Sequence, residues 1–109
     1  MALTYKVLGQ SNPAGNTVTP LYTVPSSTST VVSTLSICNQ SASTGSFRVA
    51  VRPAGASLAT QHYLSYDTVI PSNETIFFTI GLTLATTDVI TVYANSALMS
   101  FSVFGSEIS

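Results

Sequence analysis

Residues 46–52 read Ser-Phe-Arg-Val-Ala-Val-Arg, and this stretch alternates strictly between two faces of an extended chain. The larger apolar residues share one face and the remaining residues share the other: Phe47, Val49 and Val51 against Arg48, Ala50 and Arg52. A period of two with one apolar face is typical of a half-buried β-strand. No apolar period of 3.6 residues persists over three turns anywhere in the chain. The stretch therefore predicts an all-β protein.

On both sides of this stretch, similar short runs of Val, Ile, Thr, Tyr and Phe recur between Gly, Pro, Asn and Ser. The predicted strands span residues 3–8, 20–24, 30–38, 46–52, 61–66 (continued or kinked through Val69 and Ile70), 74–81, 89–94 and 98–105. Residues 9–19 are expected to form a loop. Prolines at both ends of 20–24 favour an edge strand.

The expected faces and pairings follow from the same patterns. In strand 30–38 we expect Val31, Leu35 and Ile37 on one face, and the last strand should turn Met99, Phe101 and Val103 inward. Strands 89–94 and 98–105 are predicted to form a hairpin across residues 95–97. Seven or eight short antiparallel strands with frequent turns predict one β-sandwich over residues 1–109, jelly-roll or immunoglobulin-like.

Charge is the most unusual feature of the composition. Only seven of 109 residues are charged, whereas ordinary domains carry roughly a quarter. Ser and Thr, 17 and 16 residues, fill the gap. Because soluble monomers normally keep charged surfaces, so little charge indicates a surface that contacts protein. We therefore expect an assembled structural subunit rather than an enzyme.

Several other classes are not expected. Three cations are too few to bind nucleic acid through its phosphates. No run of about 18 apolar residues predicts a membrane span, and residues 1–9 do not resemble a signal peptide. A single cysteine, Cys38, allows neither an internal disulfide nor a cysteine-based zinc site. We expect a protein made in the cytoplasm, with no cofactor and no small-molecule substrate.

Catalytic and metal-binding patterns are weak. The only histidine, His62, would need Asp67 or Asp88 for a catalytic triad, and no Gly-x-Ser-x-Gly motif accompanies it. Asp67 and Glu74 flank a turn, where turn formation explains them more simply than paired-carboxylate catalysis. One His, one Cys and scattered acids give no metal-ligand spacing. We predict no catalytic and no metal-binding residues.

Arg48 and Arg52 lie four residues apart, on the same face of one strand. One interpretation is that they keep this sheet face hydrated. The other is that they make directional contacts to a neighbouring subunit, since Arg suits planar, bidentate recognition. Tyrosine is also enriched at interfaces. The candidate subunit or capsid interface residues are Arg48, Arg52, Tyr63, Tyr66, Tyr93 and Glu107, the last because the end of the chain seals an edge or reaches a partner.

One set of segments resembles a known group of proteins. The segments are LYTVP at 21–25, VVST at 31–34 running on to Cys38 and Asn39, FRVAVRPAGA at 47–56, HYLSYD at 62–67, GLTLATTDVITVYA at 81–94, LMSF at 98–101 and FGSEI at 104–108. They resemble the small β-rich virion structural proteins of tailed phages, cyanophages among them, over about residues 20–108. The resemblance implies no catalytic residue.

That resemblance implies a virion protein that decorates or cements the capsid, or sits in the tail. We expect a homo-oligomer, specifically a trimer, that binds the major capsid protein on the outside of the assembled head. The alternatives are a tail, baseplate or fibre-associated protein and a carbohydrate-binding module. The last would use loops 9–19 and 53–60, which contain no aromatic residue on which a sugar could stack.

Overall fold

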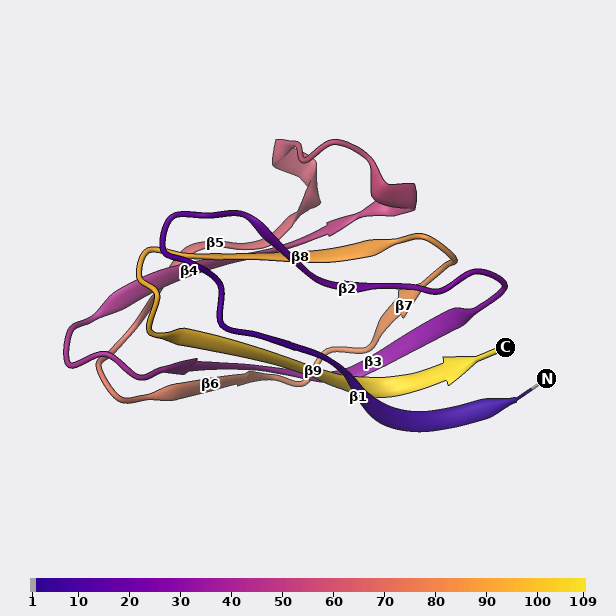
Figure 1. Cartoon of the computed structure of the whole chain (residues 1–109), viewed down its shortest axis with the longest axis horizontal. Helices are drawn as coiled ribbons and strands as arrows, with labels where there is room; N and C mark the ends of the chain where they lie inside the picture. Colours follow the sequence, from indigo (N-terminus) through magenta and orange to yellow (C-terminus); the bar gives the residue numbers. More distant parts are fainter. Residues whose placement is uncertain (1) are drawn as a thin grey trace.

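Nine antiparallel strands form two sheets packed face to face in the computed structural model, which describes residues 2–109 (Figure 1). This confirms the predicted all-β sandwich, with more strands than expected. The strands are β1 (Leu3–Ser11), β2 (Thr19–Thr23), β3 (Ser29–Asn39), β4 (Gly45–Arg52), β5 (Tyr63–Ile70), β6 (Thr75–Phe78), β7 (Leu82–Leu84), β8 (Val89–Ala94) and β9 (Met99–Ile108).

The order of the strands settles the topology that the sequence left open. The five-stranded sheet runs β1-β9-β3-β6, with β7 also pairing with β3, and the four-stranded sheet runs β2-β8-β4-β5. When β6 and β7 are counted as one interrupted strand, this is the order of an eight-stranded jelly roll, not of an immunoglobulin domain. β2 lies at the edge of its sheet, as its flanking prolines predicted.

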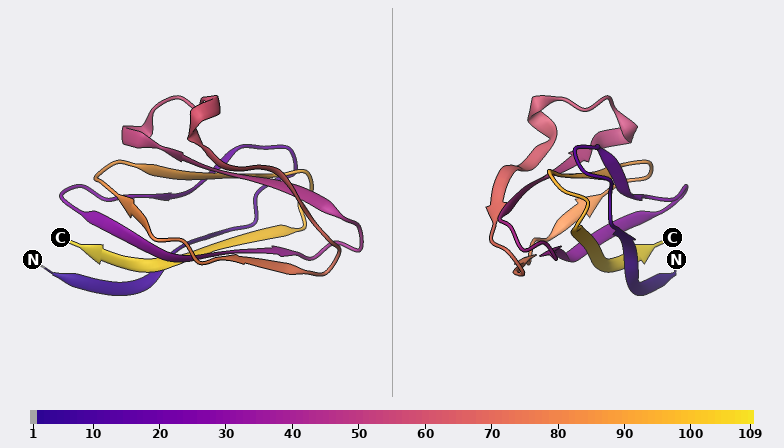
Figure 2. Two further views of the ribbon diagram at one scale, coloured as in Figure 1. Left: turned by 180° about the vertical axis from the view of Figure 1, so that it is seen from behind. Right: turned by 60° about the vertical axis from the view of Figure 1, so that its left-hand side comes forward.

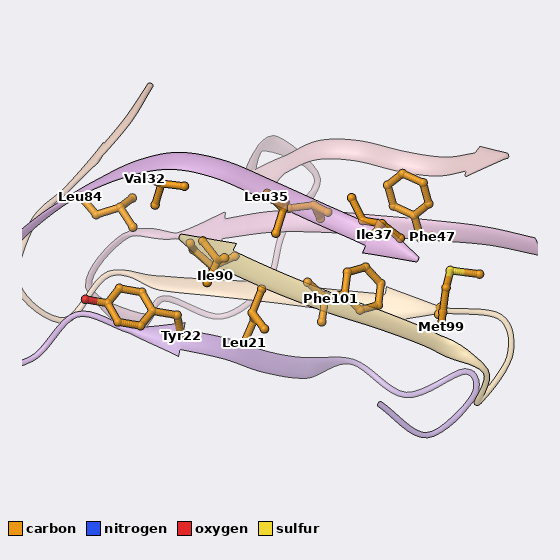
Figure 3. Close-up of a cluster of buried hydrophobic side chains, with 14 of the residues drawn as sticks. Leu21, Tyr22, Val32, Leu35, Ile37, Phe47, Leu84, Ile90, Met99 and Phe101 are labelled. Carbon is orange, nitrogen blue, oxygen red and sulfur yellow. The ribbon is translucent and has the colours of Figure 1, made fainter. Parts of the chain in front are cut away.

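The core lies between the two sheets (Figure 3). Phe47 of β4 packs near Phe101 of β9, with ring centres 6.4 Å apart in an edge-to-face arrangement. The inward residues expected on β4 and β9 are found there, since Phe47, Val49, Met99, Phe101 and Val103 are all buried. Alternation along these strands therefore identified their core faces correctly.

The predicted hairpin between residues 89–94 and 98–105 is wrong. β8 belongs to the four-stranded sheet and β9 to the five-stranded sheet. The connection at residues 95–98 crosses from one sheet to the other, which is the usual path of a jelly roll. Two consecutive apolar strands with a short polar turn look alike in sequence whether they pair or face each other across the core.

The expected inward position of Val31 is also wrong. The pairing of β3 with β9 shifts between Val32 and Thr34, so β3 contains a bulge. A bulge exchanges the faces of the residues on one side of it. Val32 is therefore fully buried and Val31 is exposed, while Leu35 and Ile37 beyond the bulge are buried as expected.

Several boundaries differ from the prediction. β1 continues through residues 9–11, which remain paired with β9, so the loop starts later than expected. Residues 61 and 62 form a short turn, and β5 then runs without interruption to Ile70. The predicted strand 74–81 ends at Phe78, and β7 follows as a separate strand.

A loop covers part of the outer face of the four-stranded sheet. It contains two 3-10 turns, η1 (Pro53–Gly55) and η2 (Thr60–His62), which contact β8 and β4 respectively. Figure 2 shows this segment standing on the side of the sheet that faces away from the other sheet. Ala50 and Thr91 form an outward-facing cross-strand pair that is nevertheless buried, as expected beneath such a cover.

Candidate functional site

The Arg48 side chain lies at the centre of a cluster on the outer face of the four-stranded sheet. Its guanidinium carbon is 4.2 Å from the ring centre of Tyr66 and 4.4 Å from that of Tyr93. Both distances are within the range of a cation–π interaction. Arg48 Nε also donates to Asp67 Oδ1 at 2.6 Å, and Nη2 donates to Asp67 Oδ2 at 3.2 Å. These hydrogen bonds raise the pKa of the Arg48 guanidinium further above its ordinary value. We call Arg48, Tyr66, Asp67 and Tyr93 the Arg48 cluster.

A bulge between β4 and β5 assembles the cluster. Phe47 pairs with Thr68 and Val49 pairs with Ser65, so two residues of β5, Tyr66 and Asp67, lie opposite Arg48 alone. Asp67 has a positive φ of 51°, a left-handed conformation that Asp adopts more readily than most residues. Bulges frequently redirect side chains beside functional sites.

Tyr93 enters the cluster from the other side. It is the cross-strand partner of Arg48 on β8, so the two side chains leave the sheet on the same face. The Tyr93 hydroxyl donates to Asn16 Oδ1 at 2.9 Å. This bond ties the cluster to the loop between β1 and β2, which limits the freedom of the tyrosine.

Beside the cluster lies a hollow of about 450 Å³. Its lining residues come from the 53–62 loop and from β5: Leu58, Ala59, Thr60, Tyr63 and Tyr66. The Tyr63 and Tyr66 rings are nearly perpendicular, with centres 4.8 Å apart. Tyr66 remains 57% exposed, so this aromatic pair can be reached from solvent.

Arg52 positions the loop that borders the hollow. Its Nε donates to Thr91 Oγ1 at 3.0 Å, and its Nη1 donates to the carbonyl of Ala56 at 3.1 Å. Asp88 holds the same loop, since its Oδ1 accepts the Ala54 amide at 2.8 Å. Nε and Nη1 of Arg52 are thus bonded within its own chain.

Glu107 lies away from the Arg48 cluster, on β9 of the other sheet. It accepts a hydrogen bond of 2.6 Å from the Tyr22 hydroxyl and pairs with Lys6 Nζ at 2.9 Å. The hydrogen bonds from Tyr22 and Lys6 lower the pKa of Glu107. Burial, together with the bond to Glu107, raises the pKa of Tyr22 to about 12. Glu107 joins the two sheets near one end of the sandwich.

Four of the six predicted interface residues therefore lie together: Arg48, Tyr63, Tyr66 and Tyr93. Arg52 borders them and Glu107 does not. Sequence reasoning missed Asp67 as the partner of Arg48, because the bulge that brings them together leaves no mark in the strand pattern. Whether these residues meet a partner stays a prediction.

Three of the side chains considered for catalysis, His62, Asp67 and Asp88, bond to atoms of the same chain. His62 Nδ1 accepts the amide of Ala59 at 3.0 Å within the η2 turn, and Asp67 is paired with Arg48. Within residues 2–109, no three His, Cys, Asp or Glu side chains gather as a metal site would require. No helix in that range has the length and apolar character to cross a membrane.

Comparisons with known proteins add no constraint. The chain matches no protein-family model, no curated protein and no solved structure.

Proposed function

We propose that this chain is a structural subunit of a tailed-phage virion, which binds the outside of the assembled capsid as an oligomeric decoration or cement protein. The observation that carries the proposal is the Arg48 cluster. Tyrosine and arginine are enriched among the few residues that dominate the binding energy of protein interfaces. In this cluster they are gathered on an otherwise nearly chargeless protein.

The cluster is organised before any partner arrives. The bidentate bond to Asp67 and the two flanking rings hold the Arg48 guanidinium in one orientation. A side chain that is already ordered loses less conformational entropy on binding. The Arg48 side chain is 23% exposed and Tyr66 is 57% exposed, so a capsid surface can contact both.

The proposed mechanism is stabilisation by preferential binding. A protein that binds the assembled shell but not the separate subunits shifts the equilibrium toward the shell by mass action. Attachment at the seams between capsomers would add buried area where packaged DNA strains the lattice. The jelly roll alone does not select this role, because the same architecture serves many functions.

Co-sedimentation with capsids tests the proposal. The purified chain should pellet with assembled empty shells of the phage that encodes it, and should not bind the unassembled capsid protein. A Tyr66→Ser variant should lose most of this binding. The control is Leu98→Ser, since Leu98 has similar exposure and lies outside the cluster. Failure of the wild-type chain to pellet with shells would overturn the capsid role and favour the tail, baseplate or fibre alternative.

One observation favours a second candidate, the carbohydrate-binding module. Loop 53–60 contains no aromatic residue, but the structure places Tyr63 and Tyr66 in the same hollow as that loop. A sugar ring could stack on Tyr66 while the Arg48–Asp67 pair offers donors and acceptors to its hydroxyls. Saturation-transfer NMR with maltotriose, cellotriose and chitotriose tests this candidate. Transfer from wild type that Tyr66→Ala abolishes would support it, and no transfer from any of the three would reject it.

A further inference from the structure

The outer face of the five-stranded sheet is apolar, and no other segment among residues 2–109 covers it. Its outward side chains include Tyr5, which is 78% exposed, and Phe77, which is 66% exposed. The larger apolar residues on this face are Leu3, Tyr5, Val7, Val31, Phe77, Phe104 and Ile108. Ser and Thr fill the positions between them, as where Ser106 separates Tyr5 from Val31. Extended apolar patches of this kind mark interaction sites on soluble proteins.

None of the seven charged side chains, all within the described residues, lies on this face. Arg48, Arg52 and Asp67 belong to the outer face of the other sheet. Lys6 and Glu107 point between the sheets near one end. Glu74 and Asp88 lie in connecting segments. The opposite outer face differs in a second way, because loop 53–62 already covers part of it.

We infer that this face binds the same face of a second copy of the chain, forming a two-fold pair. Two identical faces that carry no charged side chain meet without electrostatic repulsion between them. A capsid surface carrying ordinary charge would have to desolvate those charges against this face, at a cost that a second copy avoids. A second copy is therefore the favoured occupant.

The size of the face is sufficient for a stable pair. When β6 and β7 are counted as one interrupted strand, the sheet is four strands wide. Four strands about 4.8 Å apart and about 30 Å long present an outer face of roughly 600 Å². A pair would then bury roughly 1,200 Å² in total, which reaches the range of specific interfaces. Sheets packed face to face in this manner bury their outward side chains as a sandwich core does.

The symmetry of this contact differs from the expected trimer. A face that binds its own copy gives an isologous, two-fold contact, whereas a trimer requires two different patches on each subunit. In the pair, the two Arg48 clusters point away from each other. If the proposed function holds, only one of the two Arg48 clusters in a pair faces the shell to which the pair is bound, and this consequence rests on that function.

Sedimentation velocity over a range of concentrations tests the pair. Wild type should sediment at twice the 11.4 kDa chain mass. The double variant Val31→Lys/Phe77→Lys should weaken pairing about 100-fold or more, because like charges would meet across the contact. The control variant Leu64→Lys/Leu98→Lys alters two residues of similar exposure outside the face and should remain paired.

A mixing experiment guards against misfolding of the variant. The Lys/Lys variant mixed with Val31→Glu/Phe77→Glu should regain the paired species, since opposite charges then meet. A monomeric wild type, or a Lys/Lys variant that pairs like wild type, would overturn the inference. These outcomes are independent of the capsid role: a wild type that pairs but does not bind shells would remove the proposed function and leave the pair intact.

Discussion

Arg48 donates two hydrogen bonds to Asp67, which lies opposite it only because β5 contributes two residues where β4 contributes one. The geometry is bidentate, and lysine cannot reproduce it. The pair is at the surface, and pairs of this kind contribute little to folding stability. The main effect of the pair is therefore to fix the orientation of the side chains in the Arg48 cluster.

Replacing Arg48 with Lys should leave the melting temperature close to that of wild type while reducing binding to assembled shells. Arg52→Lys is the matched control on the same strand. Because Arg52 bonds the carbonyl of Ala56, its replacement should speed amide exchange of residues 53–62, measured by hydrogen–deuterium exchange mass spectrometry. Full shell binding by Arg48→Lys would exclude the bidentate geometry from recognition.

Tyr22→Phe should destabilise the fold by about 1–3 kcal/mol, the usual cost of leaving buried polar groups without a partner. The Tyr22 hydroxyl lies 2.8 Å from Thr30 Oγ1, which is fully buried, and 2.6 Å from Glu107 Oε2. Urea denaturation at neutral pH measures the change. Tyr5→Phe, on an exposed ring, should change the free energy of unfolding by far less, and equal effects would contradict the assignment.

Glu107 should make stability depend on acid pH. Its folded-state pKa is lowered by the hydrogen bonds from Tyr22 and Lys6. The stabilisation is therefore present above the ordinary glutamate pKa of about 4.3 and is lost as the pH falls toward the folded value. Glu107→Gln and Tyr22→Phe should both flatten the decline in melting temperature between about pH 5 and pH 3. An unchanged decline in both variants would assign the acid sensitivity to other carboxylates.

Gly105→Ala should disrupt the centre of the five-stranded sheet. A Cβ at this position would clash with the carbonyl oxygen of Val31, part of the backbone of the neighbouring strand. Backbone cannot move aside as a flexible side chain can, so we expect a loss of at least about 1–3 kcal/mol, as for overpacked cores. Gly81→Ala is the control, because no atom lies within 4 Å of its added Cβ. Thermal unfolding should separate the two variants clearly.

The class of fold could be predicted from strand alternation, which identified the inward faces of β4 and β9. What alternation does not record is which neighbour a strand pairs with. The β8–β9 hairpin was therefore predicted where the chain crosses between sheets. Alternation also gives no sign of bulges, and the bulge in β3 places Val32 rather than Val31 on the inward face.

The membership of the Arg48 cluster could be predicted only in part, for the same reason. Residue type pointed to Tyr63, Tyr66 and Tyr93, and residue type with its face of the strand pointed to Arg48; the structure brings these four together. Their partner Asp67 was missed, because its position depends on a second bulge. Glu107 was selected for its place near the end of the chain, but β9 lies between β1 and β3 rather than at an edge.

The copy number of the chain in purified virions tests the central claim most directly. Quantitative mass spectrometry against the major capsid protein gives this ratio. The proposed decoration role predicts a ratio near one, because the protein would follow the capsid lattice. A handful of copies per particle, or none, would contradict it.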